Sequence, residues 1–221
     1  MAIKNQDFVL IDFIARIKET NKIFDLTDEE TAKKENLFRK DIKYSPVLVI
    51  IGENTSLKGL EKSLIGKEVD QEYTIEIPPE EGFGKKDPKL IRIVPSRIFK
   101  EKNINPFPGL QVNIDNIIGT IRSVSGGRII IDFNHPLAGK NLIYQIKIIK
   151  KLETDQEKTN ALLEHYLKDY EIELKDTELT IKTKNNIQKQ TAQLLEEKIK
   201  KYTKVKNIKL EIIQQKTTIG K

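Results

Sequence analysis

Two stretches decide how the fold of this 221-residue chain is interpreted: Ile77-Pro78-Pro79-Glu80-Glu81-Gly82-Phe83-Gly84 and Asn134-His135-Pro136-Leu137-Ala138-Gly139. In the first, two consecutive prolines end a predicted strand, because proline cannot donate a backbone hydrogen bond within a sheet. In the second, Asn, Pro and Gly mark a tight loop. An earlier element, Gly59-Leu60-Glu61, belongs to a short apolar helix. We interpret the two stretches as halves of one pattern that the residues between them interrupt.

The composition excludes several kinds of site. The chain has no Cys and two His, so it cannot form disulfides or thiolate metal sites, and a multi-His metal centre is not expected. Its apolar runs are shorter than the roughly 18 residues that a membrane-spanning helix needs. Residues 1–7 lack the apolar core of a signal peptide. We therefore expect a soluble, cytoplasmic protein with no metal, no cofactor and no membrane partner.

The net charge of +6 bears on the choice of partners. Such a charge can attract nucleic acid, but a solvated Lys-rich surface is the preferred explanation. The chain also lacks the alternation of basic and aromatic residues that is typical of nucleic-acid platforms. Nucleic acid is therefore not expected as a partner. An adaptor that binds nucleic acid or ribosomes through the basic residues 182–221 stays open as an alternative.

Apolar periodicity predicts the elements of the N-terminal and central chain. A helix is predicted with Leu57, Leu60 and Leu64 on one face and with Thr55 or Ser56 as its N-cap. Strands are predicted over residues 8–18, 47–51, 72–77 and 142–149. The second of these is apolar throughout, so it is predicted to be buried. The strongly charged stretch before it, residues 28–43, fits a loop or a surface helix.

The interrupting segment contains strands of its own, predicted over residues 90–94, 110–114, 117–124 and 128–133. Turn-forming residues separate these strands, so the segment is predicted to form a small all-β unit. Beyond residue 152 the pattern changes to α+β. Its predicted elements are helices over residues 154–170 and 186–202, a hairpin over 171–183 and a final strand over 205–213.

The quoted motifs, together with Phe24-Asp25, resemble those of the FKBP-type peptidyl-prolyl cis-trans isomerases, and in particular the SlyD-like branch. That branch carries an extra domain inserted near the active site, and long archaeal members carry a further C-terminal domain. The resemblance implies an α+β fold in which an antiparallel sheet wraps on a short helix, a small all-β insert interrupts it, and a small α+β domain follows. The implied domains are residues 1–85 with 132–151 for the isomerase, 86–131 for a chain-binding chaperone insert, and 152–221 for a module that can form homodimers.

The implied reaction is rotation about an X–Pro bond, whose barrier is roughly 18–20 kcal/mol because twisting breaks amide conjugation. No covalent bond is made or broken, and no proton has to leave. An apolar hollow that binds the twisted, less polar amide better than the planar one is sufficient to accelerate the rotation. Such a site needs no nucleophile, metal or cofactor.

The resemblance assigns the main pocket roles residue by residue. Asp25 matches a polar group at the border of the pocket, and Leu57 matches a backbone N–H donor to the substrate. Phe83 matches a ligand-contacting aromatic residue, and Tyr144 an aromatic residue that closes the pocket from the last strand. The implied walls and floor of the pocket are Phe13, Phe24, Val47, Ser56, Leu60, Leu137 and Ala138.

Three residues depart from the family's pattern. Phe13 and Phe83 stand where many relatives have Tyr, and Leu60 stands where the best-known members have Trp. Each missing hydroxyl removes a neutral hydrogen bond worth on the order of 1 kcal/mol. We therefore expect modest activity on short peptides and weak binding of macrocyclic inhibitors. His135 is interpreted either as a proton donor or as a structural residue of its loop.

The insert of the SlyD-like branch binds unfolded chains, so the resemblance implies unfolded or nascent proline-containing polypeptides as partners. Apolar side chains rimmed by Lys and Arg would capture extended segments by desolvation. The implied chain-binding residues are Ile91, Ile93, Ile98, Phe99, Phe107 and Leu110. Many apolar residues of the insert must nevertheless fill its own core. A holdase chaperone with little isomerase activity stays open as an alternative.

Overall fold

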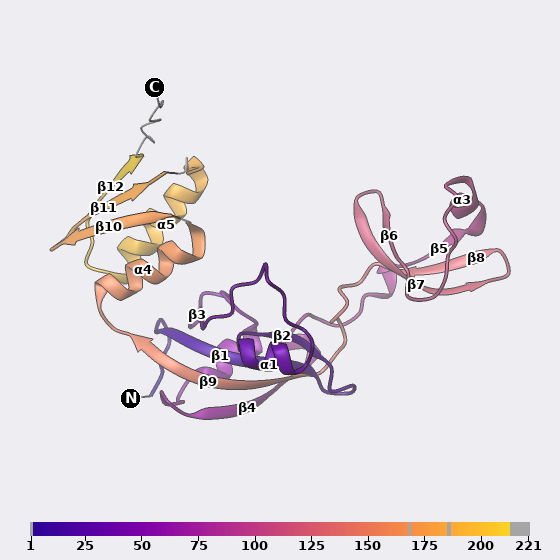
Figure 1. The fold of residues 1–221 in the computed structure, drawn as a ribbon, viewed down its shortest axis with the longest axis horizontal. Coiled ribbons are helices and arrows are strands. Elements are labelled where there is room, and N and C mark those ends of the chain that lie inside the picture. The colour runs from indigo at the N-terminus through magenta and orange to yellow at the C-terminus, as the bar shows by residue number, and fades with distance from the viewer. Residues whose placement is uncertain (1, 168, 185–186, 213–221) are drawn as a thin grey trace, which may run out of the picture.

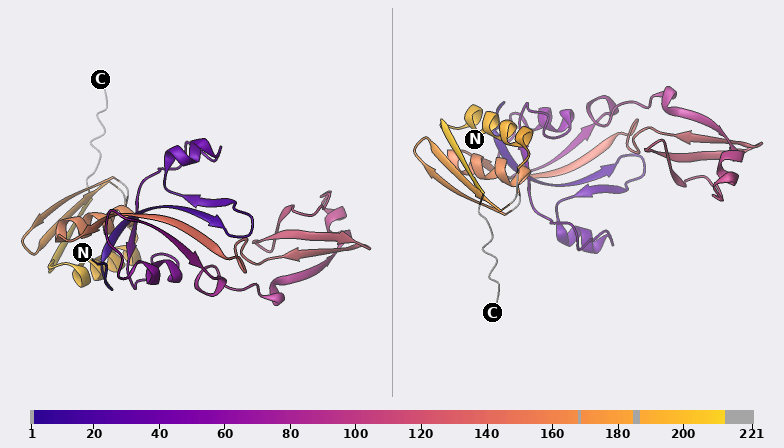
Figure 2. Two further views of the ribbon diagram at one scale, coloured as in Figure 1. Left: turned by 90° about the horizontal axis from the view of Figure 1, so that it is seen from below. Right: turned by 90° about the horizontal axis from the view of Figure 1, so that it is seen from above.

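The computed structural model describes residues 2–167, 169–184 and 187–212. Within these residues the strands form three separate sheets, and each sheet has a lobe of its own (Figure 1). The central lobe contains both halves of the interrupted motif. One lobe projects from one end of it, and the C-terminal lobe lies at the other end (Figure 2). The predicted α+β class is confirmed.

The central sheet is antiparallel and has the order β2-β1-β9-β4, with β3 paired to the same edge of β1 as β2. Its strands are β1 (Phe8–Ile17), β2 (Ile23–Leu26), β3 (Val47–Ile50), β4 (Glu72–Ile77) and β9 (Leu142–Leu152). The long strands β1 and β9 lie next to each other in the middle, so residues that are far apart in the sequence form the centre of the sheet (Figure 1).

Alternation along these strands sends one face of the sheet into the main core. Ala15, Tyr144 and Ile75 lie directly opposite one another on β1, β9 and β4, and all three are buried. Helix α2 (Lys58–Leu64) covers this face and adds Leu60 to the same core. Each fully buried apolar side chain of this kind stabilises the fold by roughly 1.5–3 kcal/mol. The predicted wrapping of a sheet around a short helix is therefore present.

Two local predictions are wrong. Strand β3 is not buried along its length, because it lies at the edge of the sheet and its first residue, Val47, is 39% exposed. Neither Thr55 nor Ser56 caps α2, whose N-cap position is Leu57 with no side-chain hydrogen bond. The Thr55 hydroxyl instead accepts a hydrogen bond from the backbone N–H of Ile50 at 2.9 Å.

The charged connection between β2 and β3 contains a surface helix, α1 (Glu29–Lys34), as the sequence allowed. The Asp28 carboxylate caps it by accepting a hydrogen bond from the backbone N–H of Thr31 at 2.6 Å. Acidic residues fill its first turn and basic residues its last, which matches the helix dipole.

The projecting lobe is built on an antiparallel sheet with the order β5-β8-β7-β6. Its strands are β5 (Ile91–Pro95), β6 (Gln111–Ile114), β7 (Ile117–Ser125) and β8 (Arg128–Asp132). The lobe also contains a helix that was not predicted, α3 (Ser96–Glu101), which places Phe99 in the core of the lobe. Two short 3-10 helices, η1 (Pro79–Glu81) and η2 (Pro88–Leu90), precede β5.

The C-terminal lobe packs two helices on a sheet of order β10-β11-β12, in which β11 and β12 are parallel. Its elements are α4 (Asp155–Tyr166), β10 (Tyr170–Lys175), β11 (Glu178–Thr183), α5 (Lys189–Tyr202) and β12 (Asn207–Ile212). The first helix is shorter than predicted, because residue 170 already belongs to β10. The predicted limits at residues 186 and 213 lie outside the described residues.

The C-terminal lobe and the central sheet share one apolar core. Phe8, Ile50 and Leu152 come from the central sheet, and they cluster with residues of α4, β11 and α5. Their partners in this cluster include Leu162, Leu163, Leu179, Ile181, Leu195 and Ile199. Among the helices that the structure describes, none is both long and apolar enough to cross a membrane.

Candidate active site

Four aromatic side chains of the central lobe meet at the sheet face that carries the main core, and we call them the aromatic site: Phe13, Phe24, Phe83 and Tyr144. The ring centroids of Phe13 and Phe24 lie 5.3 Å and 6.0 Å from that of Tyr144. Phe24 also contacts Phe83 edge to face, at 6.2 Å. Such pairs contribute about 0.5–1.5 kcal/mol beyond their burial. The three Phe residues are only partly buried, so the site presents an apolar surface to solvent.

Leu57 lies against the same core and stands at the N-terminus of α2. Within the described part of the chain, no hydrogen bond uses its backbone N–H, which therefore remains available as a donor. The preceding N–H, that of Ser56, is already bound to the Glu61 carboxylate at 2.9 Å. An unused backbone donor beside an apolar surface is suited to bind a carbonyl oxygen of a peptide.

Glu61 belongs to the quoted Gly59-Leu60-Glu61 motif but was given no role from the sequence, yet it shapes this part of the site. Its side chain is only 4% exposed although it is a carboxylate. It accepts hydrogen bonds from the backbone N–H groups of Gly52, Asn54 and Ser56, at 2.9, 3.2 and 2.9 Å. These charge-assisted bonds offset the cost of burying the charge and fix the loop before α2. The sequence feature that could have indicated this role is the position of Glu61 as an acidic residue in the first turn of α2.

Asp25 lies beside the aromatic site in the sheet. It is opposite Ala15, which is itself opposite Tyr144, so the small side chain of Ala15 separates the two polar residues in the sheet. Asp25 is exposed at its outer edge, but the protein around its carboxylate displaces water and raises its pKa, and the hydrogen bond that it accepts from the Leu26 N–H at 2.9 Å offsets part of the increase.

The Tyr144 hydroxyl has a strongly shifted acidity. Burial is the main reason that its pKa lies well above the ordinary value for tyrosine, and the nearby charge of Asp25 raises it further. The hydroxyl, like that of an ordinary tyrosine, is protonated at neutral pH and can donate a hydrogen bond. Among the four aromatic residues of the site, Tyr144 alone carries such a group.

The returning loop joins the two halves of the motif. The backbone N–H of Gly139 donates to the carbonyl of Gly84 at 2.8 Å, so the second half lies directly beside the first. The His135 ring stacks on Phe83, with centroids 4.5 Å apart and planes 5° apart. Its Nδ1 accepts a hydrogen bond from the Leu137 N–H at 3.2 Å. His135 thus supports Phe83 from outside, a contact that the sequence did not indicate.

The remaining predicted pocket residues take different places. Leu60 and Ala138 are buried, Leu60 in the main core below the aromatic site. Val47 faces the same side of the sheet as its partner Ile11, but it is exposed and does not join the described core cluster. Leu137 is half-buried in the returning loop and is likewise outside that cluster.

The predicted chain-binding residues of the projecting lobe divide into two groups. Phe99 is buried in the core of the lobe, and Leu110 packs against that core. Ile93, Ile98 and Phe107 are exposed, with Ile93 63% exposed, while Ile91 is half-buried. Ile118, which is 64% exposed, was not among the predicted chain-binding residues. The adjacent pair Ile117-Ile118 in a strand could have indicated it, since neighbours in a strand point to opposite faces.

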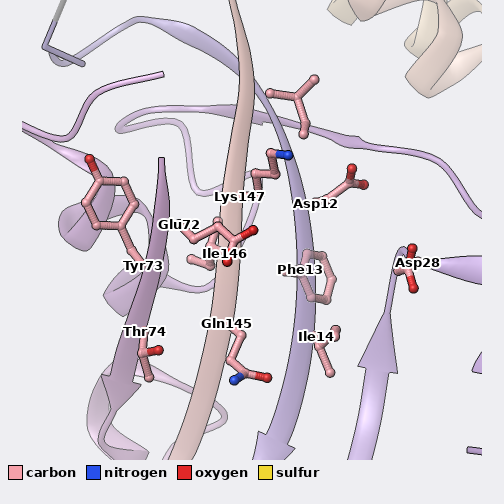
Figure 3. Close-up of a pocket in the computed structure, with 11 residues that line it drawn as sticks. Asp12, Phe13, Ile14, Asp28, Glu72, Tyr73, Thr74, Gln145, Ile146 and Lys147 are labelled. Atoms are coloured by element: carbon pink, nitrogen blue, oxygen red, sulfur yellow. The ribbon is translucent and has the colours of Figure 1, made fainter. Parts of the chain in front are cut away.

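A cleft of about 470 Å³ lies elsewhere, on the outer face of the central sheet (Figure 3). Glu72, Lys147 and Asp12 line it as one row across β4, β9 and β1. These residues alternate with the core-facing ones, so the cleft opens on the side of the sheet away from α2. It shares only Phe13 with the predicted pocket, and charged residues such as Asp12, Glu72 and Lys147 stand among its apolar lining residues. The aromatic rings that the sequence singled out converge elsewhere, so we place the candidate site at the aromatic cluster.

Among the described residues, no group of three metal-ligating side chains is present. The aromatic site offers apolar rings, one backbone donor in Leu57, the Tyr144 hydroxyl and the Asp25 carboxylate. Such a set can bind a planar apolar group and orient a carbonyl. It suits selection between conformations of a bound molecule by shape and polarity.

This chain is similar to known proteins over its central and projecting lobes. Two family descriptions match it: FKBP-type peptidyl-prolyl cis-trans isomerase over residues 1–102, and FKBP26, IF domain, over residues 92–137. The C-terminal lobe lies outside both matches. The chain is 35% identical over 146 residues to the short-type peptidyl-prolyl cis-trans isomerase of Methanocaldococcus jannaschii, which covers 66% of this chain and 92% of that protein.

Two bacterial relatives are similar over shorter stretches. A probable FKBP-type 16 kDa peptidyl-prolyl cis-trans isomerase of Pseudomonas fluorescens is 31% identical over 110 residues, 48% of this chain and 72% of that protein. The SlyD isomerase of Helicobacter pylori is 32% identical over 125 residues, 55% of this chain and 67% of that protein.

Proposed function

Because this chain belongs to the FKBP-type peptidyl-prolyl cis-trans isomerase family, we propose that its aromatic site is where X–Pro bonds of polypeptide chains rotate. The matched IF domain is proposed to capture the client chain beside that site. One observation carries the first proposal: the partly buried rings of Phe24 and Phe83 meet the buried Tyr144 at the core against which Leu57, whose N–H is unused, also packs.

The proposed mechanism is selection of the twisted imide. A planar imide has a strongly polarised carbonyl that water solvates well, and twisting reduces that polarity. The apolar rings bind the proline side of the bond while excluding water, so they favour the twisted state over the planar one. The Leu57 N–H is proposed to hold a substrate carbonyl and so to fix the chain on one side of the bond. Each 1.4 kcal/mol of such preference accelerates rotation about tenfold.

Polar groups are proposed to assist at the rim. The Tyr144 hydroxyl is protonated at neutral pH, as an ordinary tyrosine is, and its raised pKa extends this to more alkaline pH, so it can donate to the substrate or to Asp25. Phe13 and Phe83 cannot do this, which limits the number of hydrogen bonds that strengthen in the transition state. Modest turnover of short peptides and weak binding of macrocyclic inhibitors stay predictions for the same reason.

The exposed apolar surface of the projecting lobe supports its proposed role in chain capture. Among the described residues, sixteen large hydrophobic side chains are exposed, and eight of them lie between residues 86 and 131. Ile93, Ile118 and Ile130 lie on the sheet face opposite to the core, because they alternate with core residues along their strands. Exposed apolar patches of this kind mark interaction sites. Tethering a client there would raise its effective concentration at the aromatic site to roughly millimolar.

The assignment of roles to segments is part of the proposal. Residues 1–85 with 132–151 are proposed as the isomerase domain, 86–131 as the chain-binding insert and 152–221 as the C-terminal domain, in a cytoplasmic protein. Homodimers through the C-terminal domain stay a prediction. The exposed Leu210 and Ile212 on its edge strand β12 support it, and sedimentation at several protein concentrations tests it.

Peptide isomerisation tests the proposed site. Phe83→Ala removes a partly buried wall of the site, and we expect it to lower kcat/KM on a proline tetrapeptide by about tenfold or more. The matched control is Phe38→Ala, because Phe38 stacks on Tyr44 outside the site with centroids 5.6 Å apart. Equal activity of the two variants, with both folded, would place catalysis elsewhere.

A holdase without isomerase activity is the second candidate, and the eight exposed hydrophobic residues of the insert favour it. A holdase would suppress aggregation of an unfolded client while leaving X–Pro rotation unchanged. Suppression that Phe83→Ala leaves intact, together with no catalysis by the wild-type chain, would select this candidate over the first.

A further inference from the structure

Residues 52–57 form a loop that connects β3 to α2, and we call it the substrate loop because it ends at Leu57. On its inner side it is held by one buried carboxylate, that of Glu61, which accepts from three of its backbone N–H groups. Gly52 adopts a positive φ of 88°, and a Cβ there would meet the Asn5 side chain at 2.2 Å. The conformation of the inner side is thus tightly specified.

The outer side of the substrate loop is held by the C-terminal lobe. The Glu53 carboxylate pairs with Lys201 at 2.6 Å and with Lys198 at 3.4 Å, and both lysines belong to α5. The Lys201 ammonium, then the adjacent Tyr202 hydroxyl and Lys198, lower the pKa of Glu53 to about 2. The Tyr202 hydroxyl lies beside the carboxylate, although it is outside strict hydrogen-bond geometry. Glu53 and Lys198 are both mostly buried, so solvent weakens this pairing less than it weakens a surface ion pair.

Apolar contacts accompany the ion pairs. Thr55 of the substrate loop lines a small cavity together with Leu162 and Tyr166 of α4. Ile50, the last residue of β3, lies in the core shared with α4 and α5. The loop is therefore contacted by α2 on one side and by the two helices of the C-terminal lobe on the other.

We propose that helix α5 is a positioning element of the isomerase, in which Lys198 and Lys201 hold Glu53 and so keep the Leu57 N–H directed at the substrate carbonyl. This inference rests on the proposed function. It gives the C-terminal lobe a part in catalysis although the lobe does not contact the substrate. Neither lysine touches the aromatic site. Both act on the reaction through the substrate loop.

Holding the substrate loop in place is expected to act mainly on substrate binding. A donor that is ordered before binding costs less conformational entropy when the substrate arrives. Loosening the loop therefore weakens substrate binding more than it slows rotation of the bound imide, because Phe24, Phe83 and Tyr144 belong to other elements. The expected signature is a change in KM and peptide Kd with kcat nearly constant.

The test uses the full chain and three substitutions. Glu53→Gln removes the charge and keeps the shape, and Lys201→Met removes its closest partner. Lys200→Met is the matched control, since Lys200 lies on the same helix but pairs with Glu196 at 2.6 Å. Measurements are peptide Kd by titration, KM and kcat on a proline peptide, and amide hydrogen exchange of residues 52–57.

We expect Glu53→Gln and Lys201→Met each to raise KM and Kd by about 3- to 10-fold with kcat within about twofold of wild type. The double variant should be no worse than the poorer single one, because both remove the same contact. Hydrogen exchange at residues 54–57 should become faster in both variants. Lys200→Met should match wild type in every measurement.

Two results would overturn the inference, and each differs from failure of the proposed function. If Glu53→Gln behaves as Lys200→Met does while the wild-type chain is active, the function stands and the positioning role is rejected. If kcat falls in parallel with the thermal midpoint and KM is unchanged, Glu53 is merely structural. If the wild-type chain neither binds the peptide nor turns it over, the proposed function is rejected. If in that case Glu53→Gln also leaves amide hydrogen exchange of the substrate loop unchanged, the positioning role of α5 is rejected as well.

Discussion

The two lobes that flank the central sheet are attached to it in opposite ways. The C-terminal lobe shares an apolar core with the sheet through Phe8, Ile50 and Leu152. The projecting lobe has a core of its own, built on Phe99 and the residues around it, and none of its members comes from the strands of the central sheet. Figure 2 shows this lobe joined to the rest by two connecting segments.

Polar contacts fasten those two connections. The buried Asp132 carboxylate at the end of β8 pairs with Lys86 at 3.1 Å and with Arg122 at 2.7 Å. The Asn134 side chain donates to Asp132 at 2.7 Å and exchanges two hydrogen bonds with the backbone of Asp87 at 2.8 and 3.0 Å. We call these residues the junction clasp.

The difference separates two tasks. A shared apolar core makes two lobes one cooperative unit, because neither can open without exposing the other's buried surface. A polar junction fixes an orientation while each side keeps its own core. The C-terminal lobe is therefore expected to determine stability and loop geometry, whereas the insert is expected to determine how clients reach the site.

The largest expected effect on stability comes from a substitution in the shared core. Phe8 is 0% exposed and contacts Tyr202 of α5 edge to face at 5.1 Å. Phe8→Ala should lower the free energy of unfolding by about 3–5 kcal/mol, through lost burial and a cavity. Phe107→Ala, at an exposed position of the insert, should change it by less than about 0.5 kcal/mol. Denaturant unfolding of both variants measures the contrast, and similar losses would contradict it.

A smaller effect is expected at the junction clasp. Burial raises the pKa of Asp132, but hydrogen bonds from Asn134 and the Lys86 ammonium lower it by more than burial raises it. The resulting pKa is about 2. Since the folded-state pKa is below the ordinary 3.8, the stabilisation is present above about pH 4 and is lost as pH falls towards 2. Asp132→Asn should cost about 1–3 kcal/mol at neutral pH.

Its control is Asp115→Asn in the exposed turn between β6 and β7, where Asn tolerates the positive φ of 52°. Hydrogen exchange should show that Asp132→Asn loosens residues near 86 and 132 and leaves the shared core unchanged. Loosening that spreads into Phe8 and Ile50 would mean that the two attachments are not independent.

The smallest effect concerns pH and the site itself. The pKa of Asp25 is raised above 3.8 by burial, so the folded protein binds its proton more tightly than the unfolded chain does. Protonated Asp25 therefore stabilises the folded protein below that pKa, and this contribution is lost above it. Because the stabilisation is already absent at neutral pH, Asp25→Asn should leave the free energy of unfolding there equal or slightly higher. Peptide turnover of the wild type should fall by about threefold as pH drops through the same range. An identical pH profile in Asp25→Asn would remove Asp25 from the mechanism.

Much of the central sheet could be predicted from the sequence because alternation and burial coincide there. Apolar–polar alternation predicted the strands over residues 8–18 and 142–149, and Tyr144, which the resemblance singled out, lies on the core face of the second. The motif halves containing Phe83 and His135 were also expected to lie together, as the stacked rings show. These predictions depend on local pattern and on one recognised motif.

Other features depend on contacts between distant residues, which no local pattern reveals. Glu53 and Lys198 are separated by 145 residues, so nothing near either residue indicates their pairing. The helix N-cap was misplaced because Thr55 bonds to Ile50 and the buried Glu61 takes the free N–H groups. Helix α3 was missed because a six-residue helix is too short to establish a period.

Proline-limited refolding of a test protein examines the central claim most directly, using three versions of the chain. They are wild type, Phe83→Ala, and a variant in which a short Gly-rich turn replaces residues 88–131 and keeps the Asp87–Asn134 pair. We predict that Phe83→Ala loses both refolding and peptide catalysis, whereas the insert replacement loses refolding catalysis by about tenfold or more and keeps peptide turnover within about threefold. Equal losses of the two activities in the insert replacement, or full refolding activity in Phe83→Ala, would contradict the account.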